Sequence, residues 1–235
     1  YLNKRVKMKK FLTIAAFVLF TITGAQADKV RMGVTLQVGY FEADGASEIF
    51  SGAHSSGSSP GTVTKKASSE GDEAKGEFGY GSIFAEIMAT DNIGIGVNYV
   101  PMALESETTE NTQTTTTASA TGVNKVQIDF EDLTTIYALF YPVENLYLKA
   151  GYMEVEVKTN EKLASGGKYG NTTLDGYTVG VGYNYDMDNG AFVRFETSYM
   201  DIDGATLVNK NDANKKVTAE NIEGASVALS IGKTF

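Results

Sequence analysis

The chain has 235 residues, with no cysteine, no tryptophan, one histidine and 25 glycines. The lack of cysteine excludes disulfides and thiolate metal sites, and a single histidine leaves no zinc site built on several histidines. Residues 1–27 hold five basic and no acidic residues, so the remaining chain has 15 basic and 29 acidic residues, a net charge of −14 that repels nucleic acid.

The N-terminal segment has the three parts of a secretory signal peptide. A basic start at Met8 is followed by an apolar run over residues 11–20 and by small residues at Ala25 and Ala27. The run is shorter than the roughly 20 residues that a membrane-spanning helix needs. We therefore expect a signal peptide over residues 1–27, of which residues 1–7 are an upstream extension, and one β-barrel domain over residues 28–235.

Eight later segments alternate between apolar residues and small or polar ones, which is the period of a strand with two unlike faces. The last segment alternates strictly and ends on Phe235. In a soluble protein the apolar face points into a core, whereas in a membrane barrel it points to lipid. The predicted strands are residues 29–42, 76–89, 93–100, 126–141, 146–158, 173–185, 191–202 and 224–235.

Three of these strands carry details that the structure can test. Phe78 and Tyr80 break the phase of the second strand near its loop, and the phase of the fifth strand changes after Met153, which predicts a bulge. The fourth strand begins with a polar half that is expected to stand above the lipid. Its apolar face is predicted to carry Leu133, Tyr137, Leu139 and Tyr141.

The connections between the strands alternate strictly between long and short. A membrane barrel places short turns at the periplasmic end and long loops outside, and it has an even number of strands of about 9–11 residues. We therefore predict an all-β, eight-stranded, antiparallel up-and-down transmembrane β-barrel with four long extracellular loops. The long connections are residues 43–75, 101–125, 159–172 and 203–221, and the short turns lie at residues 90–92, 142–145 and 186–190.

The whole chain resembles the small eight-stranded outer-membrane β-barrels of Gram-negative bacteria, the group containing the OmpA transmembrane domain, OmpX and OmpW. The features that carry the resemblance are the signal segment, the eight strands and the last residues. Ile231, Gly232 and Phe235 are similar to the C-terminal insertion signal of this class, although Lys233 stands where an apolar residue is usual. The resemblance implies insertion by the barrel-assembly machinery, outer-membrane lipid as a partner, and Phe235 as a residue that matters for insertion.

Aromatic residues recur near the strand ends, as interfacial girdles require. The predicted interface aromatics are Tyr40, Tyr99, Tyr141, Tyr183 and Tyr185.

Charged residues also fall on the predicted lumen face, all in the half of the barrel near the periplasm. An eight-stranded barrel is just wide enough for side chains to fill it, and unpaired charges there are costly. We expect these charges to form a structural plug of ion pairs, in which Glu86 and Glu196 each bridge two cations. Inward glycines are expected to make room for the long side chains. The alternative is a polar gate in a narrow pore. This lumen charge cluster is Arg31, Glu86, Lys149, Arg194 and Glu196.

No motif for an enzyme, a cofactor or a metal stands out. Asp186, Asp188 and Gly190 resemble the start of a calcium loop, but no glutamate follows at the required distance and the residues suit a hairpin turn. His54 lies alone in a loop rich in serine and glycine. We expect no cofactor, no metal and no catalytic activity.

Two functions remain open at this stage. The first is an outer-membrane barrel with a structural role or a limited, porin-like passage of small solutes. The second is a surface adhesion or binding module that displays acidic loops rich in threonine, serine and glycine. A soluble lipocalin-like barrel would need an apolar lumen, which the inward charges oppose.

Overall fold

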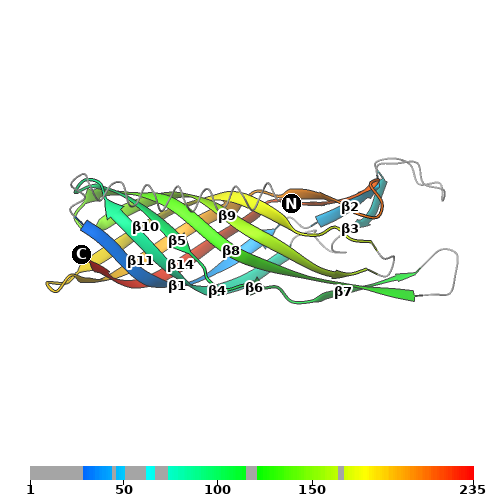
Figure 1. Ribbon diagram of the computed structural model, residues 1–235, viewed down its shortest axis with the longest axis horizontal. Helices are drawn as coiled ribbons and strands as arrows, with labels where there is room; N and C mark the ends of the chain where they lie inside the picture. The colour runs from blue at the N-terminus through cyan, green and yellow to red at the C-terminus, as the bar shows by residue number, and fades with distance from the viewer. Residues whose placement is uncertain (1–28, 44–45, 51–61, 67–73, 115–120, 164–166) are drawn as a thin grey trace.

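The computed structural model describes residues 29–43, 46–50, 62–66, 74–114, 121–163 and 167–235. Eight antiparallel strands form a closed barrel, in which β5 pairs with β4 on one side and with β8 on the other (Figure 1). This confirms the predicted eight-stranded barrel; the predicted signal peptide and His54 lie outside the described residues. The barrel strands are β1 Lys29–Ala43, β4 Ala74–Met88, β5 Ile93–Tyr99, β8 Thr121–Val143, β9 Leu146–Lys162, β10 Thr172–Asp186, β11 Ala191–Ile202 and β14 Ile222–Thr234.

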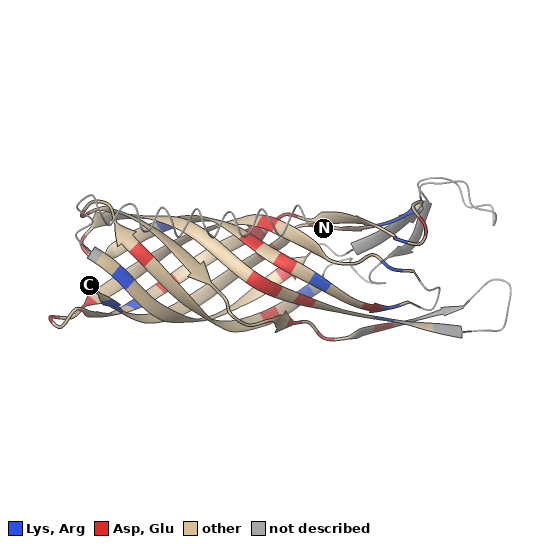
Figure 2. Cartoon of the chain, in the orientation of Figure 1, with Lys and Arg blue, Asp and Glu red and all other residues tan. Residues whose placement is uncertain are grey.

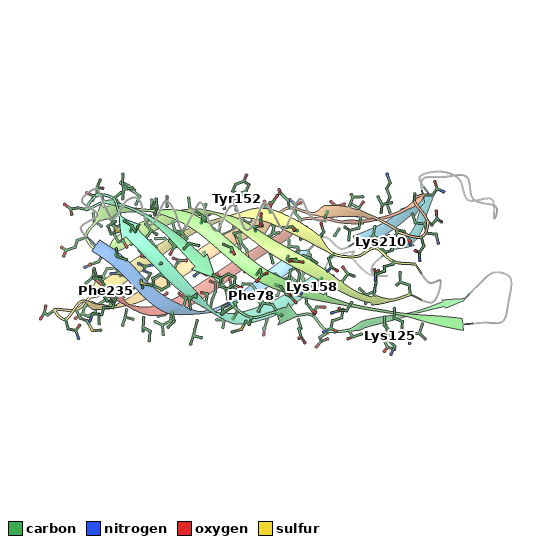
Figure 3. The ribbon with its side chains drawn as sticks, in the orientation of Figure 1. Phe78, Lys125, Tyr152, Lys158, Lys210 and Phe235 are labelled. Atoms are coloured by element: carbon green, nitrogen blue, oxygen red, sulfur yellow. The ribbon has the colours of Figure 1, made fainter. Side chains whose placement is uncertain are left out.

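The barrel has two unlike ends, which we call the turn end and the loop end. At the turn end, short connections join β4 to β5, β8 to β9 and β10 to β11. The C-terminal residue closes the wall there, since Phe235 and Val30 exchange backbone hydrogen bonds of 2.8 and 3.2 Å. Figure 3 places Phe235 at this end and Lys125 at the other. Among the described residues, no helix is long and apolar enough to cross a membrane.

The long connections contain more regular structure than the sequence predicted. Instead of exposed loops throughout, they form six short strands at the loop end. Four of these make a separate sheet in the order β12-β13-β2-β3, and β6 and β7 pair with the prolonged part of β8. The six are β2 Ala46–Phe50, β3 Thr62–Lys66, β6 Leu104–Glu105, β7 Thr109–Thr114, β12 Ala205–Val208 and β13 Lys215–Ala219.

The phase of two strands differs from the prediction. In β4, Phe78 and Tyr80 keep the phase of the strand and face inward with Glu86. In β9, the inward face continues through Met153 to Val155 without a shift. The predicted bulge lies instead on the neighbouring strand β8, where the register shifts between Glu131 and Thr134 and Asp132 has a φ of 54°.

The apolar face predicted for the fourth strand, β8, points into the barrel instead of toward lipid. Tyr137, Leu139 and Tyr141 are buried inside the barrel, and the lipid side of β8 carries Ala138 and Phe140 instead. The inward residues lie across from glycines: Gly94 is the register partner of Leu139, and Gly96 that of Tyr137. The large side chains on this strand therefore fill the narrow tube.

The outer surface changes character along the barrel axis. From the turn end, it is an apolar band of half-exposed residues such as Leu36, Val181 and Phe195. Beyond this band, the next outward residues on several strands are Asp or Glu. Figure 2 shows these acidic residues on several strands around the middle of the long axis. We call this outward set the acidic girdle: Glu42, Glu77, Glu131, Glu154, Glu156, Asp175, Asp201 and Glu223.

Within the girdle, carboxylates lie directly opposite one another on adjacent strands. Glu223 is the register partner of both Glu42 and Asp201. Two lysines offset part of this charge, because Lys75 is 3.1 Å from Glu42 and Lys158 pairs with Glu131. The hydrogen bond from Lys158 to Glu131 raises the pKa of the ammonium group, so this cation stays charged.

The interior of the barrel changes from charged to apolar between the turn end and the loop end, whereas the exterior changes from apolar to acidic. Near the turn end it is charged, and a middle section follows with hydroxyl contacts such as Thr35 to Ser230 and Ser198 to Ser226, each 2.8 Å. Nearer the loop end the interior is apolar, at the level where the exterior is acidic. This apolar core consists of Val100, Leu133, Met153, Val155, Val157, Leu174 and Ile202.

Candidate functional site

The charged section of the lumen contains a bidentate ion pair between Arg194 on β11 and Glu86 on β4. The Arg194 guanidinium donates to both carboxylate oxygens of Glu86, with N···O distances of 2.6 and 2.7 Å. Tyr137 donates a third hydrogen bond of 2.7 Å to the same carboxylate. Glu86 is 0% exposed and Arg194 4%, so this pair is out of reach of water and fixed in geometry.

Aromatic rings surround the Arg194 guanidinium. Its central carbon lies 5.0 Å from the centre of the Tyr147 ring and 5.3 Å from those of Phe84 and Phe192. Its Nε donates to the side-chain oxygen of Asn184, at 3.2 Å. Ring faces attract a cation, so the charge is stabilised on several sides besides the carboxylate.

A second pair joins β9 to β11. Lys149 donates to Glu196, and Tyr147 donates a 2.6 Å hydrogen bond to the other oxygen of that carboxylate. The ammonium also lies 5.2 Å from the centre of the Tyr137 ring. The Lys149 side chain is 14% exposed, so this pair is less completely closed off than the first.

The third cation, Arg31, lies closest to the turn end. It donates to the Tyr141 hydroxyl at 2.8 Å and to the Asp186 carboxylate at 3.4 Å. Asp186 is 45% exposed, so its ion pair with Arg31 is screened by solvent. The Arg31 Nε is buried without a partner among the described residues.

All five residues of the predicted lumen charge cluster thus lie in one section, but their pairing differs from the prediction. Glu86 and Glu196 each bind one cation and one tyrosine instead of bridging two cations. Asp186 supplies the third negative charge, which makes three of each sign. The sequence pattern does not single out Asp186, because residues 186–190 suit a hairpin turn. Its inward direction follows from the phase of β10, in which Asp186 continues the inward positions of Asn184 and Gly182.

The inward glycines also have a different role from the one predicted. They make room for rings across from them, not for long charged side chains. A Cβ on Gly182 would lie 2.3 Å from the Tyr147 ring, and one on Gly33 would lie 2.6 Å from the Phe84 ring. In both cases the glycine and the ring belong to register partners on adjacent strands. Matching glycines to aromatics across predicted strand pairs would have found this arrangement.

This packing predicts that Gly182→Ala destabilises the barrel. The Tyr147 ring is fully buried and hydrogen-bonded to Glu196, so it cannot move away from a new methyl group. We expect a loss of about 1–3 kcal/mol in the free energy of unfolding, measured by urea titration in detergent micelles. Gly79→Ala is the matched control, because its Cβ would make an ordinary contact of 3.5 Å with Val38. Equal effects of the two substitutions would contradict the packing argument.

The other predicted site residues lie mostly on the outside. Tyr40, Tyr183 and Tyr185 are exposed on the outer face, and Tyr99 donates a 2.8 Å hydrogen bond to Asp132. Tyr141 is the exception, and its predicted place at the interface is wrong, because its ring is buried in the lumen, where its hydroxyl accepts a hydrogen bond from Arg31. The C-terminal set follows the wall, with Ile231 and Phe235 exposed, Gly232 next to the Phe192 ring, and Lys233 over the Phe235 ring at 5.6 Å.

The residues that resembled a calcium loop form a turn. Met187 and Ala191 pair through a 2.8 Å backbone hydrogen bond, and Gly190 has a φ of 82°, which favours glycine. Asp186 is engaged with Arg31. Within the part of the chain that the structure describes, no group of three or more His, Asp or Glu side chains is arranged to hold a metal ion.

Comparison with known proteins gives one clear result. The family described as the outer membrane protein β-barrel domain matches residues 12–235, whereas no curated protein matches. Among solved structures, OprG from Pseudomonas aeruginosa has a TM-score of 0.43 at 13% identity, covering 86% of this chain and 95% of that one. Ail of Yersinia pestis, in complex with the heparin analogue sucrose octasulfate, has a TM-score of 0.40 at 10% identity, covering 88% and 99%. Neisserial surface protein A has a TM-score of 0.36 at 15% identity, covering 86% and 97%.

Proposed function

The chain belongs to the outer membrane protein β-barrel family, and from this premise we propose that it is a closed barrel that anchors a surface-exposed, strand-rich extension. The observation that carries the proposal is the complete burial of the Glu86–Arg194 pair in the charged section of the lumen, near the turn end. A side chain that lines an open aqueous channel is exposed to water, whereas these two charges are not. The lumen charge cluster is then a plug.

A second section supports closure. Nearer the loop end, the inward side chains of Val155, Leu174 and Ile202 belong to one packed apolar cluster. Hydrophobic constrictions oppose the entry of ions because the ions would lose their hydration. The proposed closure therefore has two unlike parts in series, one ionic and one apolar.

The prolonged strands support the anchoring role. β8 has 23 residues and β9 has 17, more than the roughly 9–11 that a membrane crossing requires. The acidic girdle marks where the exterior ceases to suit lipid, so the strands beyond it stand outside the membrane. The length of these strands supports a surface-binding module more than a pore.

Limited passage of small solutes is the second candidate. One observation favours it: the middle section is lined by small hydroxyl side chains, including Thr35, Ser198 and Ser230. Passage would require both closures to open. The closed barrel therefore agrees better with the structure than a pore does.

Protease added to intact cells tests the exposure of the extension. We expect cleavage in the segments beyond the acidic girdle and a protected fragment that remains in the outer-membrane fraction, because the barrel wall is fully hydrogen-bonded within the apolar band. Cells with a permeabilised outer membrane are the control for periplasmic sites. A chain that fractionates as a soluble periplasmic protein, or one that is cut only after permeabilisation, would contradict the proposal.

A further inference from the structure

The extension beyond the acidic girdle contains two separate groups of strands. One is the four-stranded sheet β12-β13-β2-β3, and the other is the hairpin of β7 and the prolonged part of β8, which stands apart from that sheet in Figure 1. The outer strand of a sheet leaves the backbone N–H and C=O groups on one of its sides unpaired. Such an edge is a template for pairing with another chain, and native proteins usually block it.

Both outer strands of the four-stranded sheet are blocked. The segments that flank β12 are hydrogen-bonded to neighbouring backbone, because Asp203 N donates to Asp175 O at 2.8 Å and Lys210 N donates to Lys168 O at 2.6 Å. The other outer strand, β3, has the sequence TVTKK, and its register with β2 is irregular. A covering segment, edge lysines and an irregular register are devices that prevent edge-to-edge pairing.

The outer strand of the hairpin, β7, has none of these devices. It pairs with β8 from Thr109 to Thr114 without a register shift, and no described strand pairs with its other side. Its sequence, TENTQT, contains neither lysine nor proline, and its threonines favour strand structure. Six residues present a free backbone edge of roughly 20 Å. The hairpin can therefore accept one more strand.

The charges beside this edge determine which strand it accepts. Glu105 and Glu107 precede β7 and are exposed, and neither forms an ion pair with a described residue. Glu110, within β7, is already paired with Lys125 on β8. The unpaired charge beside the edge is therefore negative. It attracts an extended segment that carries lysine or arginine and repels an acidic one.

We propose that β7 binds a basic polypeptide segment in extended conformation, which adds to the hairpin as a further strand. Backbone hydrogen bonds to the free side of β7 supply the pairing, and Glu105 and Glu107 attract the cationic side chains of the partner. The inference rests on the proposed surface-binding role and names the class of partner. Binding takes place at the hairpin and not at the four-stranded sheet.

A synthetic decapeptide of alternating lysine and valine tests this inference with the full barrel in detergent micelles. Fluorescence anisotropy of the labelled peptide should show binding at least tenfold tighter than that of a decapeptide of alternating glutamate and valine. Hydrogen exchange should slow at the backbone amides of residues 109–114 and not at those of residues 62–66. The lysine–valine peptide with every backbone amide N-methylated keeps its charge but loses its N–H donors, so it should bind at least tenfold more weakly.

Two double variants test the contribution of the carboxylates. Glu105→Gln with Glu107→Gln should weaken binding of the lysine–valine peptide about tenfold and make it less dependent on salt. Asp203→Asn with Glu220→Gln is the matched control, because it removes the same charge from exposed positions next to the four-stranded sheet. The control should bind the peptide as tightly as the wild type does.

Several outcomes would overturn the inference. Equal binding of the N-methylated peptide would show that charge alone attracts it, without strand addition. Protection of residues 62–66 instead of 109–114 would assign binding to the four-stranded sheet, and a dimer that protects residues 109–114 without peptide would assign the edge to a second copy of the chain. An extension that protease cannot reach on intact cells contradicts the proposed function itself, whereas an accessible extension that binds no lysine–valine peptide overturns this inference alone.

Discussion

Glu86→Gln is expected to lower the free energy of unfolding by about 3–5 kcal/mol. The substitution keeps the volume of the side chain but leaves the Arg194 charge without a carboxylate in a section closed to water. The aromatic rings and Asn184 cannot replace a bidentate anion. Urea unfolding of the barrel in micelles, followed by tyrosine fluorescence, measures the loss.

Two further variants separate the loss of the pair from the loss of packing. Replacing both partners, with Glu86→Gln and Arg194→Met in one chain, removes the isolated charge and should recover most of the stability. Glu196→Gln should cost less than Glu86→Gln, because Lys149 is partly exposed and can reach water. An unchanged unfolding midpoint in Glu86→Gln would mean that the lumen charges are hydrated independently.

Much of the barrel could be predicted because a period of two is a local property of the sequence. β11 has the predicted bounds, and the other barrel strands begin and end within five residues of the prediction. The cluster charges could also be assigned to the lumen, since Arg31, Lys149 and Arg194 alternate with apolar neighbours that suit lipid.

The predicted directions of side chains are wrong where an apolar residue points into the barrel instead of toward lipid. Tyr137, Tyr141 and Val155 are apolar enough for a lipid-facing position, yet they point inward. A tube of eight strands must be filled, so its interior accepts large rings opposite glycines and, nearer the loop end, aliphatic side chains. Such choices depend on the residue across the strand pair, which a pattern along one strand does not contain.

The partners within the charge cluster could not be predicted for a similar reason. Arg194 and Glu86 are 108 positions apart in sequence and lie on strands separated by two others. Their pairing depends on stagger and tilt around the whole wall. Nothing in the sequence pattern connects Tyr137 to Glu86 or Tyr147 to Glu196, although each tyrosine donates a hydrogen bond to its carboxylate.

The conductance of the barrel in a planar lipid bilayer shows whether the lumen is closed. An open channel would carry ions through the section of Glu86 and Arg194, and these two residues are sealed from water. Beyond them, ions would also have to pass the apolar cluster around Val155 and Leu174. A variant with Glu86→Ala and Arg194→Ala should still carry no current, because the apolar section remains closed.

The measurement requires evidence that the barrel is inserted, which protease protection of the reconstituted protein provides. A general porin, reconstituted in the same bilayers, shows that single channels would be detected. With a closed lumen, we expect no stepwise current from the wild-type barrel at any voltage at which the bilayer itself is stable. Reproducible current steps from the inserted wild-type barrel would contradict the closure of the lumen.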